Sequence, residues 1–266
     1  HLATPAPFQP RQRMWLVRAE RAILATGMIE RPIVFGNNDL TGVMLASAAR
    51  TYVNRYAVAP GSKVVVFTNN DTAYAAAWDL SAAGAEVSIV DVRSRIPAPL
   101  QAQMTAAGIA LHLGSAVGRA NGGRHVRSVD VVPFDTAKPE RAGIRMRLTC
   151  DLLAVSGGWT PTLHLLGQRG SKPVYDEEKA MLVAGAIPER FDIVGGAAAN
   201  CALRHCIESG AKAGHAAASA SGRPYAASGS LLLDGLPDHP GTYNIAPVWL
   251  VPDPLGKGHG KKFVDL

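Results

Sequence analysis

The sequence has few aromatic residues, few cysteines and no long apolar run, and each shortage excludes a class of protein. Phe, Trp and Tyr make up 6% of the 266 residues. No stretch approaches the ~20 apolar residues of a membrane-spanning helix, so we expect no membrane segment. The cysteines, Cys150, Cys201 and Cys206, are too few for a disulfide framework and lack the C-x-x-C spacing of a redox dithiol. We therefore expect a cytoplasmic protein.

The sequence also lacks the clusters that mark metal, nucleic-acid and catalytic sites. Its eight histidines are dispersed, with no H-E-x-x-H or Cys/His group, so we expect no metal. The net charge is +6, but the Lys and Arg residues are scattered and no recognition motif accompanies them, so we expect no nucleic-acid partner. No nucleophile–base pair or carboxylate dyad is visible, and we assign no catalytic residue to this chain.

What the sequence does contain is one complete β-α-β pattern between Val64 and Asp91. The run "VVVFTNNDTAYAAAWDLSAAGAEVSIVD" gives a buried strand, a polar turn, an alanine-rich helix, a glycine turn and a second strand ending in Asp. This order is typical of dinucleotide-binding domains. Together with 47% hydrophobic residues and 27 glycines, it indicates an α/β fold in which helices pack closely on a sheet.

The turn of this unit departs from the glycine-rich motif that binds dinucleotides. Thr68, Asn70 and Ala73 stand where G-x-G-x-x-G has its glycines. Ala73 still permits close helix packing, but the Asn70 side chain fills space where a pyrophosphate would approach the backbone. Asp71 repels phosphate, whereas Asp91 stands where a ribose-binding acid would. Two interpretations stay open, a nucleotide site or a structural unit, and the substitutions favour the second.

Hydrophobic periodicity predicts the other elements. Beyond the β-α-β unit, helices are expected over 43–58, 98–108 and 201–222. From Arg223 onward, Pro, Gly and Ser dominate, which predicts a linker or an arm lying on another domain. Strands are predicted within 14–27 (two), 109–113, 115–134 (two), 144–156 (two), 181–185 and 191–196, and 28–42 is predicted to be a loop.

Three of the predicted strands end in glycine and small residues. They end at Ala25, Thr26 and Gly27, at Gly157 and Gly158, and at Gly195 and Gly196. Ligands bind at the carboxyl ends of parallel strands, and glycine lets a backbone approach them. In this order around a β-α-β unit, the pattern is typical of flavoprotein reductases with two dinucleotide-binding domains, the second inserted in the first. The alternative is three ordinary strand-to-turn junctions.

Longer segments carry a family resemblance. "ILATGMIERPIVFGNNDLTGVMLASAARTYVNRYAVAPGSKVVVFTNNDTAYAAAWDL", "CDLLAVSGGWTPTLHLL", "PVYDEEKAMLVAG" and "YNIAPVWLVP" resemble the alpha subunits of heterotetrameric sarcosine oxidases. The resemblance covers essentially the whole chain. The alpha subunits of proline dehydrogenase and opine oxidase, and hydrogen cyanide synthase, are similar in the ATG framework but match "NDLTGVMLASAARTYVNRY" less well.

The resemblance implies a function in an oxidoreductase complex. Such complexes oxidise sarcosine to glycine with oxygen, giving hydrogen peroxide and a folate-bound one-carbon product. It implies NAD on the alpha subunit, FAD and a covalent FMN mainly on the beta subunit, and tetrahydrofolate on the C-terminal half of alpha. The implied partners are the beta, gamma and delta subunits. The implied NAD pocket contains Ala25, Thr26, Gly27, Gly195 and Gly196, while Ala197 replaces the acid that flavin reductases carry.

The resemblance also implies how the chain is divided. Residues 1–36 and 170–222 are expected to form the remnant of a first dinucleotide-binding (Rossmann-like, FAD/NAD(P)-binding reductase type) domain that lacks its N-terminal β-α-β. Residues 37–169 are the expected inserted second domain, and 223–266 an extended linker or arm. We expect an internal fragment that acts as an NAD-holding and FMN-interface scaffold, inactive by itself. The alternatives are an NAD(P)H-dependent flavoprotein reductase or an alpha subunit of a related amine, opine or proline dehydrogenase.

Overall fold

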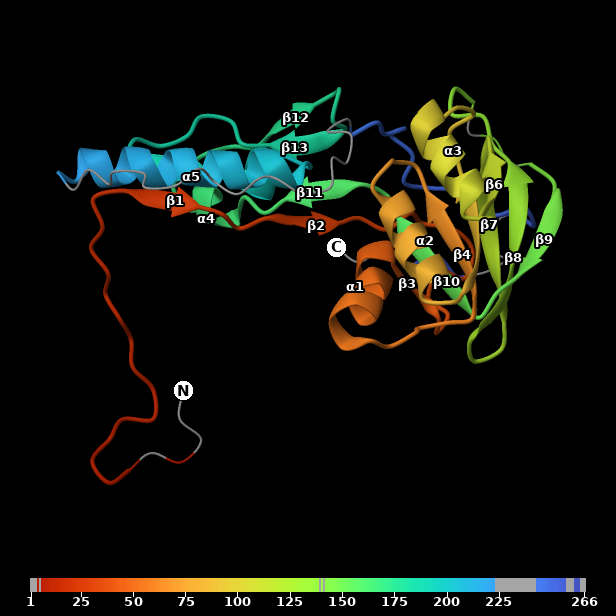
Figure 1. Ribbon diagram of the computed structural model, residues 1–266, viewed down its shortest axis with the longest axis horizontal. Coiled ribbons are helices and arrows are strands. Elements are labelled where there is room, and N and C mark those ends of the chain that lie inside the picture. Colours follow the sequence, from red (N-terminus) through yellow and green to blue (C-terminus); the bar gives the residue numbers. More distant parts are fainter. Residues whose placement is uncertain are drawn as a thin grey trace.

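The chain forms two bodies joined by a narrow connection, with an extended segment before the first strand (Figure 1). The computed structural model describes residues 4, 6–138, 140, 142–222, 243–256 and 261–263. We call the body that holds strands β3–β10 and helices α1–α3 the larger body. The other, with β1, β12–β14, α4 and α5, is the smaller body.

A five-stranded parallel sheet in the order β3-β10-β4-β5-β6 is the centre of the larger body. The apolar runs of β4 and β10 supply its two middle strands, which explains why nearly every residue in them is buried. The β-α-β unit predicted over 64–91 is present as β4, α2 and β5. The strands are β3 (Val43–Leu45), β4 (Lys63–Thr68), β5 (Glu86–Asp91), β6 (Ala110–Leu113) and β10 (Leu152–Ser156).

Alternate residues of the central strands build two separate cores. Val64 and Val66 of β4 face a cluster that includes the small residues of α1 and α2. Val65 and Phe67 face the opposite side, which an antiparallel sheet of order β7-β8-β9 covers. The larger body is therefore three layers deep. Its remaining elements are α1 (Ala46–Tyr56), α2 (Ala73–Ala82), α3 (Ala98–Ala106), β7 (Ser115–Gly122), β8 (Val126–Pro133) and β9 (Met146–Thr149).

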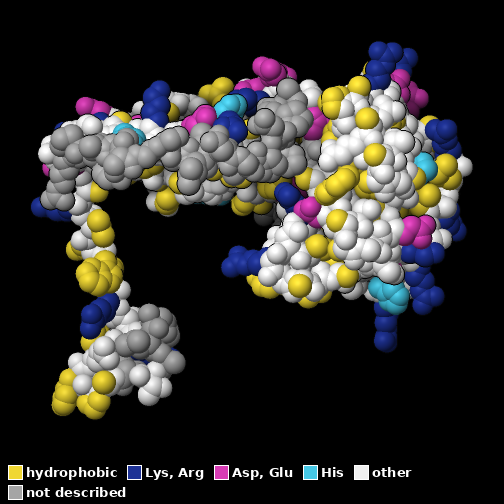
Figure 2. Space-filling view, viewed as in Figure 1, with side chains coloured by type: hydrophobic (Ala, Val, Ile, Leu, Met, Phe, Trp, Pro, Cys, Tyr) yellow, Lys and Arg dark blue, Asp and Glu magenta, His cyan; other side chains and the backbone are white. Residues whose placement is uncertain are grey.

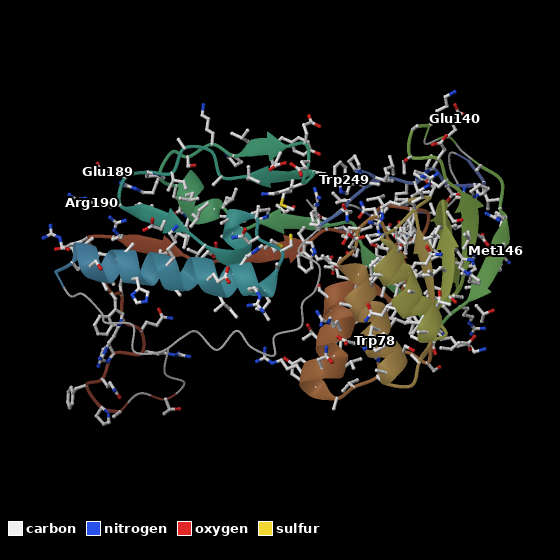
Figure 3. All side chains as sticks on the ribbon, turned by 45° about the horizontal axis from the view of Figure 1, so that its top comes forward. Trp78, Glu140, Met146, Glu189, Arg190 and Trp249 are labelled. Carbon is white, nitrogen blue, oxygen red and sulfur yellow. The ribbon has the colours of Figure 1, made fainter. Side chains whose placement is uncertain are left out.

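The smaller body is built around the parallel pair β1 and β14. Leu24 pairs with Ile193, so two apolar segments far apart in the sequence share one sheet. Helix α5 lies beside this pair in both views (Figures 1 and 3). The elements are β1 (Ala22–Leu24), α4 (His164–Gly167), β12 (Val174–Asp176), β13 (Met181–Val183), β14 (Phe191–Ile193), the 3-10 turn Gly195–Ala198 and α5 (Leu203–Ala220).

Two antiparallel strands, β2 (Met28–Glu30) and β11 (Trp159–Pro161), carry the chain between the bodies. We call them the connecting ribbon.

Beside the ribbon, residues 243–256 pack on the larger body, where Val248 and Val251 are buried in its core. We call this segment the arm. It was predicted to be a linker or an arm on another domain. Its described part packs on the larger body, while 223–242, 257–260 and 264–266 lie outside the described residues.

Several predictions of local structure are wrong. Residues 14–17 form no strand and are exposed on the extended segment (Figure 2), since the described chain offers them no pairing partner. The predicted loop 28–42 contains β2. The predicted helix 43–58 begins with strand β3, because Val43–Leu45 pair with β10. In β1 the side chain of Ile23 is 37% exposed, so the described residues cover this face of the strand only in part.

No helix in the described part of the chain is both long and apolar enough to cross a bilayer. Within the same residues, no group of three or more His, Cys, Asp or Glu side chains is arranged to hold a metal ion.

Candidate functional site

The turn between β4 and α2 (residues 68–73, the Asn-Asn turn) is filled by its own side chains. Asn70 is fully buried and its Nδ2 donates to Ser156 Oγ at the end of β10 over 3.0 Å. Its Oδ1 accepts from the backbone N–H of Thr72 over 3.0 Å, a side-chain turn typical of Asn. Asn70 therefore occupies the space between two strand ends and the start of the helix, where the glycine motif would leave room for phosphate.

Asp91, the acid at the end of β5, is paired with other groups of the same chain. Asp91 is 0% exposed, and its Oδ2 accepts from Arg93 Nη2 over 2.7 Å and from the Tyr74 hydroxyl over 2.8 Å. Its Oδ1 accepts from the Arg93 backbone N–H over 2.9 Å. Burial and the Asp91 carboxylate raise the pKa of Tyr74, so its hydroxyl stays a donor. Both carboxylate oxygens have partners, and neither is left for a ribose.

The arm lies across the same edge of the sheet. Asn69 Nδ2 donates to the carbonyls of Ala246 over 2.9 Å and Val248 over 3.0 Å. Asn244 Nδ2 donates to Asp71 Oδ2 over 2.7 Å, and Asn70 forms a backbone bridge with Ile245. The carboxyl ends of β4 and β5 thus face a segment of the same chain, which supports the structural interpretation of the β-α-β unit.

Two of the candidate glycines are explained by packing. A Cβ on Gly157 would lie 2.5 Å from the Pro32 carbonyl oxygen, and one on Gly158 would lie within 3.0 Å of Ile245 and Arg31 side-chain atoms. Gly158 also has φ +93°, which favours glycine. Because these two positions touch the chain itself, the candidate ligand site depends on the other five residues.

The other two glycine-rich strand ends meet in the smaller body. A Cβ on Gly196 would lie 3.2 Å from Gly27 Cα, so the ends of β1 and β14 are in contact. Gly27 has φ +73°, yet a Cβ built on it finds no atom within 4 Å. The side chain of Thr26 is held by a 2.7 Å bond to the Thr162 carbonyl. Gly27 therefore needs its conformation for the turn and faces open space, as a backbone that approaches a ligand would.

Ala25 and Gly195 complete this group. Gly195 also has a left-handed φ, +62°, and its N–H donates to Ser209 Oγ on α5 over 3.2 Å. Ala197, which stands in place of the reductase acid, is buried at 1% exposure. The predicted residues Ala25, Thr26, Gly27, Gly195 and Gly196 are thus brought together, without a charged side chain among them.

The cysteines are not activated as nucleophiles. Burial raises the pKa of Cys150 to about 12 and that of Cys201 to about 11, so both thiols are protonated at neutral pH. Cys201 lines a cavity of about 300 Å³ between the smaller body and the arm, with Lys179, Asn200, His205 and Tyr243 among its other residues.

Sequence reasoning missed two charged residues at the connecting ribbon, Glu30 and Arg31. Glu30 is 5% exposed, and its Oε2 accepts from the Ser47 backbone N–H in the first turn of α1 over 2.7 Å. It therefore caps a helix that has no side-chain cap of its own. Burial raises its pKa above 4.5. The only sequence signal was a pair of charges beside Pro32 in a segment assigned to a loop.

Glu30→Gln is expected to flatten the pH dependence of stability. A carboxyl whose pKa is raised on folding stabilises the fold fully below its unfolded pKa, and this contribution is lost as pH rises through the folded value. The wild type should therefore lose more stability than the variant between pH 4.5 and about pH 8. Urea denaturation at several pH values across this range measures the free energy of unfolding. Glu86→Gln is the control, because the Glu86 side chain is 77% exposed. Parallel curves for wild type and Glu30→Gln would contradict the assignment.

Comparison with known proteins identifies the relatives of the chain. No family model matches it. The sarcosine oxidase subunit alpha of Rhizobium meliloti (strain 1021) is 36% identical over 253 residues, which is 95% of this chain and 24% of that protein. The subunit alpha of Corynebacterium sp. (strain U-96) is 37% identical over 262 residues, 96% of this chain and 26% of that protein. Sarcosine oxidase alpha subunits are homologues of this chain. It spans about a quarter of the length of these sarcosine oxidase subunits, whose name marks them as oxidoreductases.

Solved structures agree on the fold. T. acidophilum thioredoxin reductase superposes with a TM-score of 0.58 at 17% identity, covering 76% of this chain and 66% of that one. L-proline dehydrogenase from P. horikoshii superposes with a TM-score of 0.53 at 21% identity, covering 78% of this chain and 36% of that one. The homologue of sarcosine oxidase alpha described here therefore has the FAD/NAD(P)-binding reductase fold, as the sequence predicted.

Proposed function

We propose that this chain is a segment of the alpha subunit of a sarcosine-oxidising complex and serves there as a scaffold that helps to hold NAD. The proposal rests on the homology over nearly the whole chain and on the open, glycine-rich junction of β1 and β14. In the complex, FAD and FMN on a beta subunit would carry the oxidation of sarcosine to glycine with release of hydrogen peroxide. Tetrahydrofolate would take the one-carbon product, and gamma and delta subunits would complete the assembly.

The proposed NAD contacts are Ala25, Thr26, Gly27, Gly195 and Gly196. Three features support them: the contact between Gly27 and Gly196, the left-handed φ of Gly27, and the free space above it. Uncharged small residues suit a dinucleotide backbone that approaches the main chain. The carboxyl ends of β4 and β5 are a poorer candidate, since the arm and the Asp91–Arg93 pair occupy that edge. The same observation disfavours an NAD(P)H-dependent flavoprotein reductase with two nucleotide sites.

Gly27→Val is expected to abolish NAD retention by the full-length natural protein while leaving it folded. Valine would place its side chain in the free space above Gly27 and strain the left-handed turn. NAD content after purification, read by liquid chromatography, measures the effect. Gly84→Val is the matched control, because Gly84 also has a left-handed φ of +94° and free space. Gly84 lies in the turn between α2 and β5, away from the proposed site.

Two outcomes of this experiment would overturn the proposed site. One is a Gly27→Val protein that keeps its NAD through purification. The other is an equal loss of NAD in Gly84→Val, which would trace the effect to general strain. The folded state is checked independently by thermal denaturation of both variants.

A further inference from the structure

We propose that the arm locks the two bodies in one relative orientation, with Trp249 as the latch residue at the connecting ribbon. Figure 3 labels Trp249 where the two bodies meet. This inference does not depend on NAD binding or on the identity of the amine substrate.

The connecting ribbon is by itself a weak coupling. Its strands β2 and β11 have three residues each, and Gly157 and Gly158 lead into β11. Two-stranded ribbons are marginally stable and twist readily, and glycines add backbone freedom. Between two compact bodies, such a link would permit rotation unless other contacts oppose it.

The arm is fixed firmly to the larger body. Val248 and Val251 are buried in the core beneath the parallel sheet. The backbone of Val34 donates to the Trp249 carbonyl over 2.8 Å and accepts from the Val251 N–H over 2.8 Å. With the two bonds from Asn69, these contacts make the arm move with the larger body as one unit.

From this anchored position the arm makes three contacts in or next to the ribbon. Trp249 Nε1 donates to the carbonyl of Gly157, two residues before β11, over 2.9 Å. The guanidinium of Arg31, directly after β2, lies over the Trp249 ring, 4.7 Å from its centre. Within β11, the Trp159 N–H donates to the Tyr243 hydroxyl over 3.1 Å. The arm, which moves with the larger body, is therefore attached to β11 and to the residue that follows β2.

Arg31 extends this contact into the smaller body. Its Nη2 donates to the carbonyl of Ala180, in the turn between β12 and β13, over 2.8 Å. No ion pair to Arg31 occurs within the residues that the structure describes, and its Nε there has no hydrogen-bond partner. On the arm, the Trp249 ring and the Tyr243 hydroxyl both contact this cation. A continuous path runs from the larger-body core through Trp249 and Arg31 to the β12–β13 turn.

The role of Trp249 in fixing the orientation can be tested by measuring the distribution of distances between the two bodies. Spin labels would be placed on non-natural amino acids at Glu208 on α5 and Arg124 in the β7–β8 turn, both exposed, in the full chain. Pulsed electron resonance would then give the width of the distance distribution. We expect a narrow distribution in the wild type and a width at least about twice as large in Trp249→Ala.

Two matched controls separate the latch from simple damage. Leu250→Ala changes the next residue of the arm, whose side chain is 56% exposed, and Trp78→Ala removes a 41% exposed Trp elsewhere. Both should keep the wild-type width. Should Trp249→Ala fail to fold, Arg31→Met and Trp249→Phe remove the cation and the indole donor separately, and each should broaden the distribution. Equal widths in wild type and folded latch variants would overturn the proposal, as would a wild type already as broad as Trp249→Ala.

Discussion

Asp91→Ala is expected to destabilise the fold by roughly 3–5 kcal/mol, because it removes one partner from a buried ion pair. Arg93, whose side chain is 10% exposed, would keep Asp71 as its one carboxylate partner among the described residues. The Tyr74 hydroxyl would lose the acceptor that it meets at 2.8 Å. Urea denaturation followed by circular dichroism measures the loss.

The same variant separates the two interpretations of the β-α-β unit. If the unit is structural, Asp91→Ala should leave NAD affinity of the full-length protein unchanged under conditions where the variant is folded. A tenfold loss of affinity, about 1.4 kcal/mol, would instead place the nucleotide at the larger body. Glu86→Ala is a suitable control on the same strand. Glu86 faces Lys63 across 3.9 Å with both side chains exposed, and such pairs contribute about 0–1 kcal/mol.

Asn69→Ala is expected to cost about 1–3 kcal/mol, because it leaves the buried carbonyl of Val248 without its donor. The Ala246 carbonyl loses the same donor but still accepts from the Val248 N–H. Both carbonyls belong to the arm, so the loss should appear first as release of the arm. Limited proteolysis would detect this as earlier cleavage within 243–256, and urea denaturation would give the total loss.

Asn38 offers a matched control for Asn69. Asn38 also bonds to a late segment, with its Nδ2 donating to the Phe263 carbonyl over 2.7 Å, but this contact is exposed. Asn38→Ala should therefore change stability by less than about 0.5 kcal/mol. Equal losses in the two variants would mean that burial of the Asn69 contacts contributes nothing.

The elements that the sequence predicted well are those in which local pattern and final environment agree. The run Val64–Phe67 is apolar throughout because it lies in a central strand, and α2 is rich in alanine because it packs against the sheet. The homology and the reductase fold followed from the same region. Strand β2 was missed because its three residues gain their partner, β11, from more than a hundred positions away. The hydrophobic periodicity within a segment carries no information on a pairing partner so far away in the sequence.

The candidate site was predictable only in part for the same reason. Glycine at three strand ends indicated where a backbone could approach a ligand, but glycine serves close packing equally well, as Gly157 does against Pro32. Only the neighbours distinguish these roles. The segment from Arg223 onward was predicted to be a linker or an arm on another domain because Pro, Gly and Ser dominate there. Val248 and Val251 fill the core from an irregular backbone, which sequence periodicity does not record.

The Asn-Asn turn has a consequence for competition with free ligands. The arm that covers it belongs to the same chain, so it meets the turn at an effective concentration that does not depend on the amount of free ligand. A diffusing dinucleotide would have to exceed that concentration, or bind far more tightly than Asn244–Val248 do, before it displaced them. A free ligand would therefore have to displace the arm before it could reach this edge of the larger body.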